Sequence, residues 1–146
     1  MTLKLRAIKN ISICIIVLVA GLLGLRFFHF SIQSDTTKVA KAYLEQEGFI
    51  VLHYAGENGP YRVTKRSAME FPHSKLLAVQ EQPVDFYRGR DLHDKSFYVA
   101  NHPLQTGYTS VVLMMDGEEV VGAVSVRNGQ VHSLHGKTAE EMSTEK

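Results

Sequence analysis

Tryptophan is absent from this chain of 146 residues, and cysteine occurs once, as Cys14. A single cysteine cannot form an intramolecular disulfide, and because Cys14 lies within an apolar run we interpret it as a small buried apolar side chain. The sequence also lacks a G-x-S-x-G motif and a glycine-rich phosphate loop between a strand and a helix. It therefore carries no signature of a hydrolase nucleophile or a nucleotide site, and we predict no cofactor.

Acidic residues are missing from the first 30 positions, which hold four of the 16 lysines and arginines. Residues 31–146 therefore contain all 15 acidic residues against 12 basic ones, a balance of −3. Nucleic-acid binding needs clustered lysines and arginines that neutralise phosphates. This charge distribution argues against a nucleic-acid partner.

The longest apolar run covers residues 11–30 and is uncharged up to Arg26. At about 1.5 Å per residue, a helix of this length crosses the hydrocarbon core of a bilayer, which is about 30 Å thick. Arg26 lies near one end, where its long side chain reaches the lipid headgroups. We therefore predict a transmembrane helix over 11–30, with the lipid bilayer as a partner. Its anchor residues are Ile11, Ile15, Leu18, Leu22, Leu25 and Phe28.

Three basic residues, Lys4, Arg6 and Lys9, precede the apolar run. The positive-inside rule then places residues 1–10 in the cytoplasm and residues 31–146 outside it, in a single-pass cell-membrane protein. A cleaved signal peptide is the alternative, but no A-x-A-like junction follows the run. Ala20 and Gly24 lie one helical turn apart and would permit a homodimer, which a single small-residue pair does not favour.

A helix is predicted at the start of the soluble part. Ser34 and Asp35 are good N-cap residues, and Gly48 supplies a left-handed C-cap. Between them an apolar stripe contains Val39, Ala40, Tyr43 and Leu44.

Strand signals dominate the remainder. Turn formers at 56–60 predict a hairpin between strands at 49–54 and 61–64, and a second hairpin joins 109–115 to 119–127, followed by a strand at 130–134. A helical turn at 66–71, strands at 76–80 and 95–100, and a final helix opened by a capping box at 138–141 complete the prediction. Because strands and helices do not alternate, the fold class is α+β with a mainly antiparallel sheet and short helices. The apolar strand faces are expected to bury Phe49, Val51, Val63, Phe97, Val99, Val111, Leu113, Val121 and Val124.

Four segments occur in an order typical of one protein family. They read LAVQ at 77–80, FYVANHPL at 97–104, VVG at 120–122 and SLHGKTAEE at 133–141. Together they resemble a family of small uncharacterised membrane-anchored or exported proteins of Gram-positive spore-forming bacteria, over residues 35–142. The family has an acid at the position of His135 and tends to have tyrosine at that of His132. The resemblance implies an exported location and an α+β domain, and no known activity.

Histidines provide the candidate contact residues. Asn101 and His102 belong to an Asn-His-Pro-Leu segment, which we interpret as a structural corner or as a contact with a ligand or partner. His132 and His135 lie three residues apart, and with His102 they would supply a metal site if they converged. A strand at 130–134 does not ensure that convergence, so we predict no metal.

A run of mixed charges at 85–95 is interpreted as a solvated polar loop, because paired catalytic carboxylates need an enclosing apolar pocket. The sequence therefore predicts a membrane-anchored extracytoplasmic binding or interaction module without catalytic residues, whose partner is another membrane or extracytoplasmic protein. The alternatives are a small extracytoplasmic enzyme or metal-binding domain that uses His102, His132 and His135, and a structural subunit of a membrane complex.

Overall fold

The computed structural model describes residues 14–25, 34–104 and 106–144 of the chain. The chain divides into two units, Met1–Ser34 and Asp35–Lys146. In the first unit, residues 14–25 form a helix whose side chains are all exposed. Cys14 is exposed, because no described residue packs over it. The prediction that this side chain is buried is therefore wrong.

Within the three described ranges, no helix combines the length and apolar character needed to cross a membrane. The predicted span at 11–30 is described only over 14–25. Ile15, Leu18, Leu22 and Leu25 are exposed on this helix. Ile11, Phe28, Arg26 and the basic residues Lys4, Arg6 and Lys9 lie outside the described residues.

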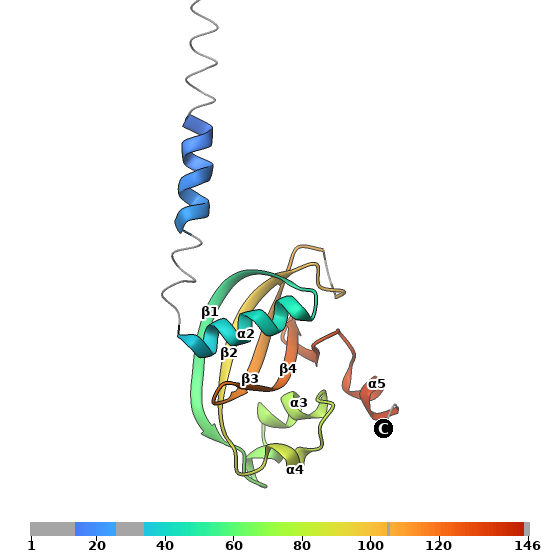
Figure 1. Cartoon of the computed structure of the whole chain (residues 1–146). Helices are drawn as coiled ribbons and strands as arrows, with labels where there is room; N and C mark the ends of the chain where they lie inside the picture. The colour runs from blue at the N-terminus through green and yellow to red at the C-terminus, as the bar shows by residue number, and fades with distance from the viewer. Residues whose placement is uncertain (1–13, 26–33, 105, 145–146) are drawn as a thin grey trace, which may run out of the picture. The chain divides into compact units, whose positions relative to one another are not determined.

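The second unit is built on a five-stranded antiparallel sheet in the order β1-β2-β3-β4-β5. The strands β1 to β4 are labelled in Figure 1. The strands are β1 (Ile50–Arg62), β2 (Asp91–Ala100), β3 (Tyr108–Asp116), β4 (Glu119–Arg127) and β5 (Gln130–Ser133). Each strand pairs with the next along the chain, so the sheet is a meander. The predicted α+β class is confirmed.

Short helices cover both faces of this sheet. They are α2 (Asp35–Gln46), the 3-10 turn η1 (Ser67–Met69), α3 (His73–Ala78), α4 (Val84–Tyr87) and α5 (Ala139–Thr144). The Lys95 ammonium of β2 donates to Thr37 of α2, whereas Leu92 clusters with Leu77 of α3 and Tyr87 of α4. Since Lys95 and Leu92 point to opposite faces of β2, α2 lies on one face and α3 and α4 on the other.

The core has a layer on each face of the sheet. Alternating residues of β2 and β3 on the α2 side, such as Phe97 and Leu113, are fully buried. On the other side a cluster contains Val63, Leu77, Tyr87, Leu92, Met114 and Val121. All nine apolar residues that the sequence placed in the core are buried, which confirms that prediction.

The predicted hairpin at 49–64 is wrong, because β1 continues through the glycine-rich segment without reversing. Register shifts between Tyr54 and Gly56 and between Asn58 and Tyr61 allow β1 to curve along β2. At Gly59 (φ 128°) a Cβ atom would lie 2.9 Å from the Leu92 carbonyl oxygen, so this glycine permits close approach of the two strands. The turn formers mark bulges here, not a chain reversal.

Three local predictions also differ from the structure. The apolar run at 76–80 lies mostly in helix α3, since a run this short does not distinguish a strand from a buried helix. The mixed-charge run at 85–95 is not a solvated loop, because it forms α4 and the start of β2 and buries Tyr87 and Lys95. Val39, which the sequence placed in the apolar stripe of α2, is exposed. Thr37 lies on the buried face of this helix instead.

Several sequence signals are confirmed. Gly48 follows α2 with φ 88°. The β3–β4 hairpin and the Asn128-Gly129 turn occur where they were predicted. At the start of α5, Thr138 and Glu141 form a reciprocal capping box: the Thr138 N–H donates to the Glu141 carboxylate at 2.7 Å, and the Glu141 N–H donates to Thr138 Oγ1 at 3.3 Å.

Candidate functional site

The first half of β4 has an edge that β5 does not cover. Pairing between β4 and β5 ends at Val124 and Ser133, although β4 begins at Glu119. An uncovered strand exposes backbone N–H and C=O groups, which must find other partners or pair with a foreign strand. In this protein two side chains from the α3–α4 region take that position.

Gln80, which follows α3, binds the β4 backbone as a neighbouring peptide group would. Its Nε2 donates to the Ala123 carbonyl oxygen at 3.3 Å, and its Oε1 accepts from the Ala123 N–H at 3.2 Å. Nε2 also donates to the Leu76 carbonyl oxygen at 3.1 Å. Gly122 leaves room for this carboxamide, since a Cβ there would lie 2.8 Å from Oε1. Gln80 thus closes the strand edge.

Tyr87 closes the next position along the same edge. Its hydroxyl donates to the Val121 carbonyl oxygen at 3.1 Å, while its ring is almost completely buried. Burial, followed by the nearby charge of Glu81, raises the pKa of Tyr87 to about 12. The phenol therefore stays protonated at neutral pH and remains a hydrogen-bond donor.

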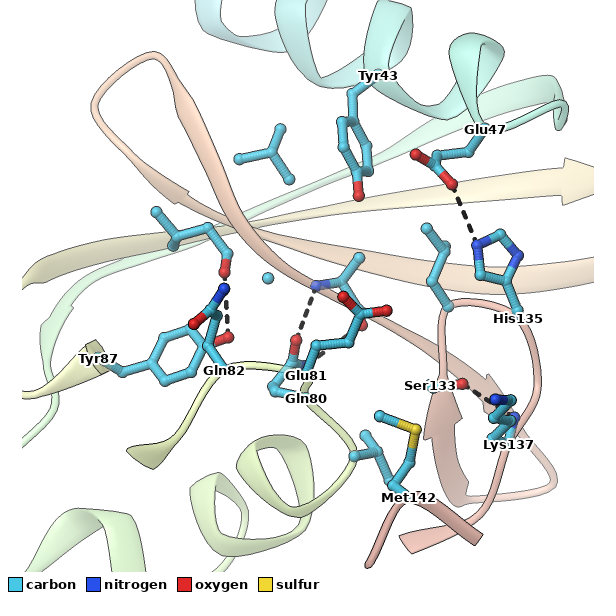
Figure 2. Close-up of a pocket in the computed structure, with 16 residues that line it drawn as sticks. Tyr43, Glu47, Gln80, Glu81, Gln82, Tyr87, Ser133, His135, Lys137 and Met142 are labelled. Carbon is cyan, nitrogen blue, oxygen red and sulfur yellow. Dashed lines mark hydrogen bonds and ion pairs between the residues drawn. The ribbon is translucent and has the colours of Figure 1, made fainter. Parts of the chain in front are cut away.

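A cleft of about 510 Å³ lies along this edge, and we call it the β4-edge cleft. Its walls come from the end of α2, the turn after α3, α4, the uncovered part of β4, the end of β5 with the segment after it, and α5 (Figure 2). The lining consists of Tyr43, Glu47, Val79, Gln80, Glu81, Gln82, Tyr87, Val120, Val121, Gly122, Ala123, Ser133, Leu134, His135, Lys137 and Met142. Six separate segments of the domain therefore meet around one concavity.

Charged groups of both signs line the cleft. His135 Nε2 lies 3.1 Å from the Glu47 carboxylate, which links the segment after β5 to α2. Tyr43 projects from α2 into the cleft on the side of Glu81 (Figure 2). Burial, and then the charges of Glu47 and Glu81, raises the pKa of Tyr43. Both tyrosines therefore experience the negative potential of the cleft acids.

The Tyr43 hydroxyl and the Glu81 carboxylate are cleft groups without an internal role among the described residues. Within the described part of the chain, neither the Tyr43 hydroxyl nor the Glu81 carboxylate makes a hydrogen bond or ion pair. By contrast, Gln80 and Tyr87 bind the strand edge, and Ser133 Oγ accepts from the Lys137 N–H at 2.9 Å. Tyr43 and Glu81 are thus available to a ligand.

The Asn-His-Pro-Leu segment forms internal contacts. Asn101 (φ 56°) accepts from the Ile50 N–H at 3.0 Å and donates to the Gly48 carbonyl oxygen at 2.8 Å, so it joins the end of α2 to β1. His102 accepts from the Leu104 N–H through Nδ1 at 3.1 Å. Its Nε2 then carries the proton and donates to the Leu134 carbonyl oxygen at 2.8 Å. These bonds support the interpretation of a structural corner, and contact with a partner stays a prediction.

The other two candidate histidines lie in different surroundings. His135 lines the cleft and stacks on Phe49, with ring centroids 5.9 Å apart. His102 stacks on the same ring at 5.3 Å. His132 lies on β5 opposite Ser125, and its buried Nδ1 has no hydrogen-bond partner among the described residues. Residues 14–25, 34–104 and 106–144 contain no group of three histidine, cysteine or acidic side chains arranged to hold a metal ion.

Sequence reasoning identified His135 but missed Tyr43, Gln80, Glu81 and Tyr87 as cleft residues. The sequence predicts a strand at Gln80 and a solvated loop at Tyr87. The family-like segments at 77–80, 120–122 and 133–141 all contribute residues to the cleft lining. They are the sequence feature that could have indicated the cleft. Their meeting in space could not be read from their separation along the chain.

Comparisons of the chain with protein-family models, curated proteins and solved structures found no significant match. The family resemblance of the four segments therefore stays a prediction.

Proposed function

We propose that this protein is a membrane-anchored extracytoplasmic binding module and that its ligand occupies the β4-edge cleft. The observation that carries the proposal is that some polar groups of the cleft bind the protein's own backbone while others have no internal partner among the described residues. Gln80 and Tyr87 saturate the strand edge, whereas the Tyr43 hydroxyl and the Glu81 carboxylate face the cleft without an internal partner.

The ligand class follows from the charges. Burial raises the pKa of Tyr43 most, and the charges of Glu47 and Glu81 raise it further, so these two acids make the potential around Tyr43 more negative. A carboxylate and a phenol oxygen accept hydrogen bonds, and both favour a ligand that presents N–H donors, such as an amine or an amide. Because Gln80 already fills the strand edge, we do not expect an added β-strand as the occupant.

Binding is favoured over catalysis for a chemical reason. A nucleophilic site needs a hydroxyl or thiol within hydrogen-bond reach of a base. Ser133 Oγ accepts from the Lys137 N–H, and no base among the described residues is hydrogen-bonded to it. The Tyr87 hydroxyl donates to a carbonyl oxygen. The cleft is therefore arranged to recognise a ligand.

The membrane location is part of the same proposal. Residues 11–30 would form the anchor and Lys4, Arg6 and Lys9 would retain the N-terminus in the cytoplasm. A reporter that is active only outside the cytoplasm, fused after Lys146, should be active. Neutralising the three basic residues should scramble this orientation, and an unchanged, uniform orientation would refute their role.

Site-specific cross-linking tests the cleft in the full-length protein. Gln82→p-benzoylphenylalanine places a photoreactive ring at the cleft of the protein in its own membrane and leaves Tyr43 and Glu81 intact. Illumination should yield a discrete adduct identifiable by mass spectrometry, and Glu81→Gln should reduce its yield. The matched control is Glu118→Gln, which removes an exposed acid in the β3–β4 turn outside the cleft lining. No adduct, or equal loss in both variants, would refute the cleft as the binding site.

A further inference from the structure

Asp94 of β2 is a buried carboxylate that forms no ion pair among the described residues. Its exposed fraction is 9%, and it points to the face of the sheet that carries α3 and α4. Neither lysine nor arginine forms an ion pair with it among the described residues. Its neighbour Lys95 points to the opposite face and pairs with Glu57. Buried acids in proteins are normally paired, so Asp94 is an exception that needs a reason.

The hydrogen bond that Asp94 forms to a side chain among the described residues leaves most of the capacity of its carboxylate open. The Tyr61 hydroxyl donates to Asp94 Oδ1 at 2.6 Å. An ionised carboxylate accepts about four hydrogen bonds. Burial raises the pKa of Asp94, and the hydrogen bond from Tyr61 and the charges of His73 and His93 oppose that shift.

Asp94 lies in a second concavity, separate from the β4-edge cleft. This Asp94 groove has a volume of about 410 Å³ and is lined by Asn58, Gly59, Pro60, Tyr61, Pro72, His73, Leu76 and Asp94. The rings of Tyr61 and His73 lie with centroids 4.9 Å apart and planes inclined by 51°. The groove thus combines one buried carboxylate with aromatic walls.

We propose that the Asp94 groove binds a guanidinium group. A guanidinium is planar, stacks on aromatic rings and forms paired hydrogen bonds to a carboxylate, which matches the Tyr61 and His73 rings beside the Asp94 carboxyl group. The group is carried either by a small molecule or by an arginine of a protein partner. This site is independent of the β4-edge cleft, so its failure leaves the proposed function untouched.

The test uses the full-length, ¹⁵N-labelled protein in zwitterionic nanodiscs, titrated with ethylguanidinium and followed by amide chemical shifts. The amides of Asp94 and Tyr61 should shift saturably. Ethylurea, which has nearly the same shape but no charge, should cause no saturable shift. A peptide with one central arginine between glycines and blocked ends should bind more tightly than ethylguanidinium if the source is a protein partner, and no more tightly if it is a small molecule.

Asp94→Asn removes the charge and keeps an oxygen that accepts from Tyr61, so the fold should be retained. It should weaken ethylguanidinium binding at least about 10-fold, as loss of a buried charge partner does. The control is Asp91→Asn on the same strand, whose carboxylate pairs with Arg62 at an exposed site and should not matter. Wild-type binding should also fade as the pH falls through the pKa of Asp94. Equal affinity in Asp94→Asn, or no saturable shift in the wild type, would overturn the proposal.

Discussion

Replacing Gln80 by leucine should lower the free energy of unfolding of the domain, by an amount set by the backbone groups that lose their hydrogen bonds to Gln80. Gln80 is 4% exposed and makes two buried hydrogen bonds to Ala123 and one to Leu76. Leucine has a similar volume, so little packing is lost. The substitution leaves the Ala123 N–H and C=O without partners, and each unsatisfied buried group costs about 1–3 kcal/mol. Since the cleft admits water near the carbonyl, we expect a total of about 2–4 kcal/mol.

Thermal unfolding of the full-length protein, followed by circular dichroism in a neutral detergent, measures this cost. For a domain of this size the melting temperature should fall by about 8–16 °C. Gln82→Leu is the control, because Gln82 is exposed beside the same cleft. Its melting temperature should stay close to that of the wild type. A Gln80→Leu melting temperature equal to that of Gln82→Leu would show that water or another group satisfies the β4 edge, and would refute this account of the cleft.

Three further predictions concern the folded domain. Residues 35–146, which form a unit by themselves, should express as a soluble protein with a cooperative thermal transition that does not depend on added zinc. Lys95→Met should leave stability within about 1 kcal/mol of the wild type, because an apolar replacement of similar length avoids the cost of burying an ion. Glu57→Gln should cost more, because it leaves the buried Lys95 ammonium without an anionic partner. Equal effects of the two substitutions in denaturant titrations would contradict this. Burial lowers the pKa of His102, so protonation of this side chain favours the unfolded state. Its contribution to stability should be complete above pH ~6.5 and should decline as the pH falls toward the folded-state pKa. His102→Gln, measured in parallel, should lack that component of the decline.

Local sequence signals located most of the secondary structure correctly. The Asn128-Gly129 turn, the Gly48 C-cap and the Thr138–Glu141 capping box depend on residues within a few positions of one another, and each was found where the sequence placed it. Period-two alternation in the strands likewise identified the buried face, as Phe97 and Leu113 illustrate. These features need no knowledge of the rest of the chain.

Predictions failed where a local signal had two tertiary outcomes. The glycines at 56–60 are compatible with a chain reversal and with a series of bulges. Because the segment pairs with β2, it forms bulges. The charged run around Lys95 predicts a solvated side chain. Lys95 is buried instead, because Thr37 and Glu57, which are far away in sequence, bind its ammonium group. In each case the deciding partner is remote in sequence.

The sequence by itself determined the α+β class, the antiparallel arrangement of β3, β4 and β5, and nine buried apolar residues of the strands, because propensity, turn chemistry and apolar periodicity act over short distances. Only the tertiary structure decided the two candidate sites. The β4-edge cleft exists because β5 ends early and Gln80 reaches the exposed edge of β4 from 43 positions away. Asp94 meets Tyr61 and His73 because β1 curves along β2 and α3 packs beside them. A concavity is a relation among several segments, so no single segment carries its signature.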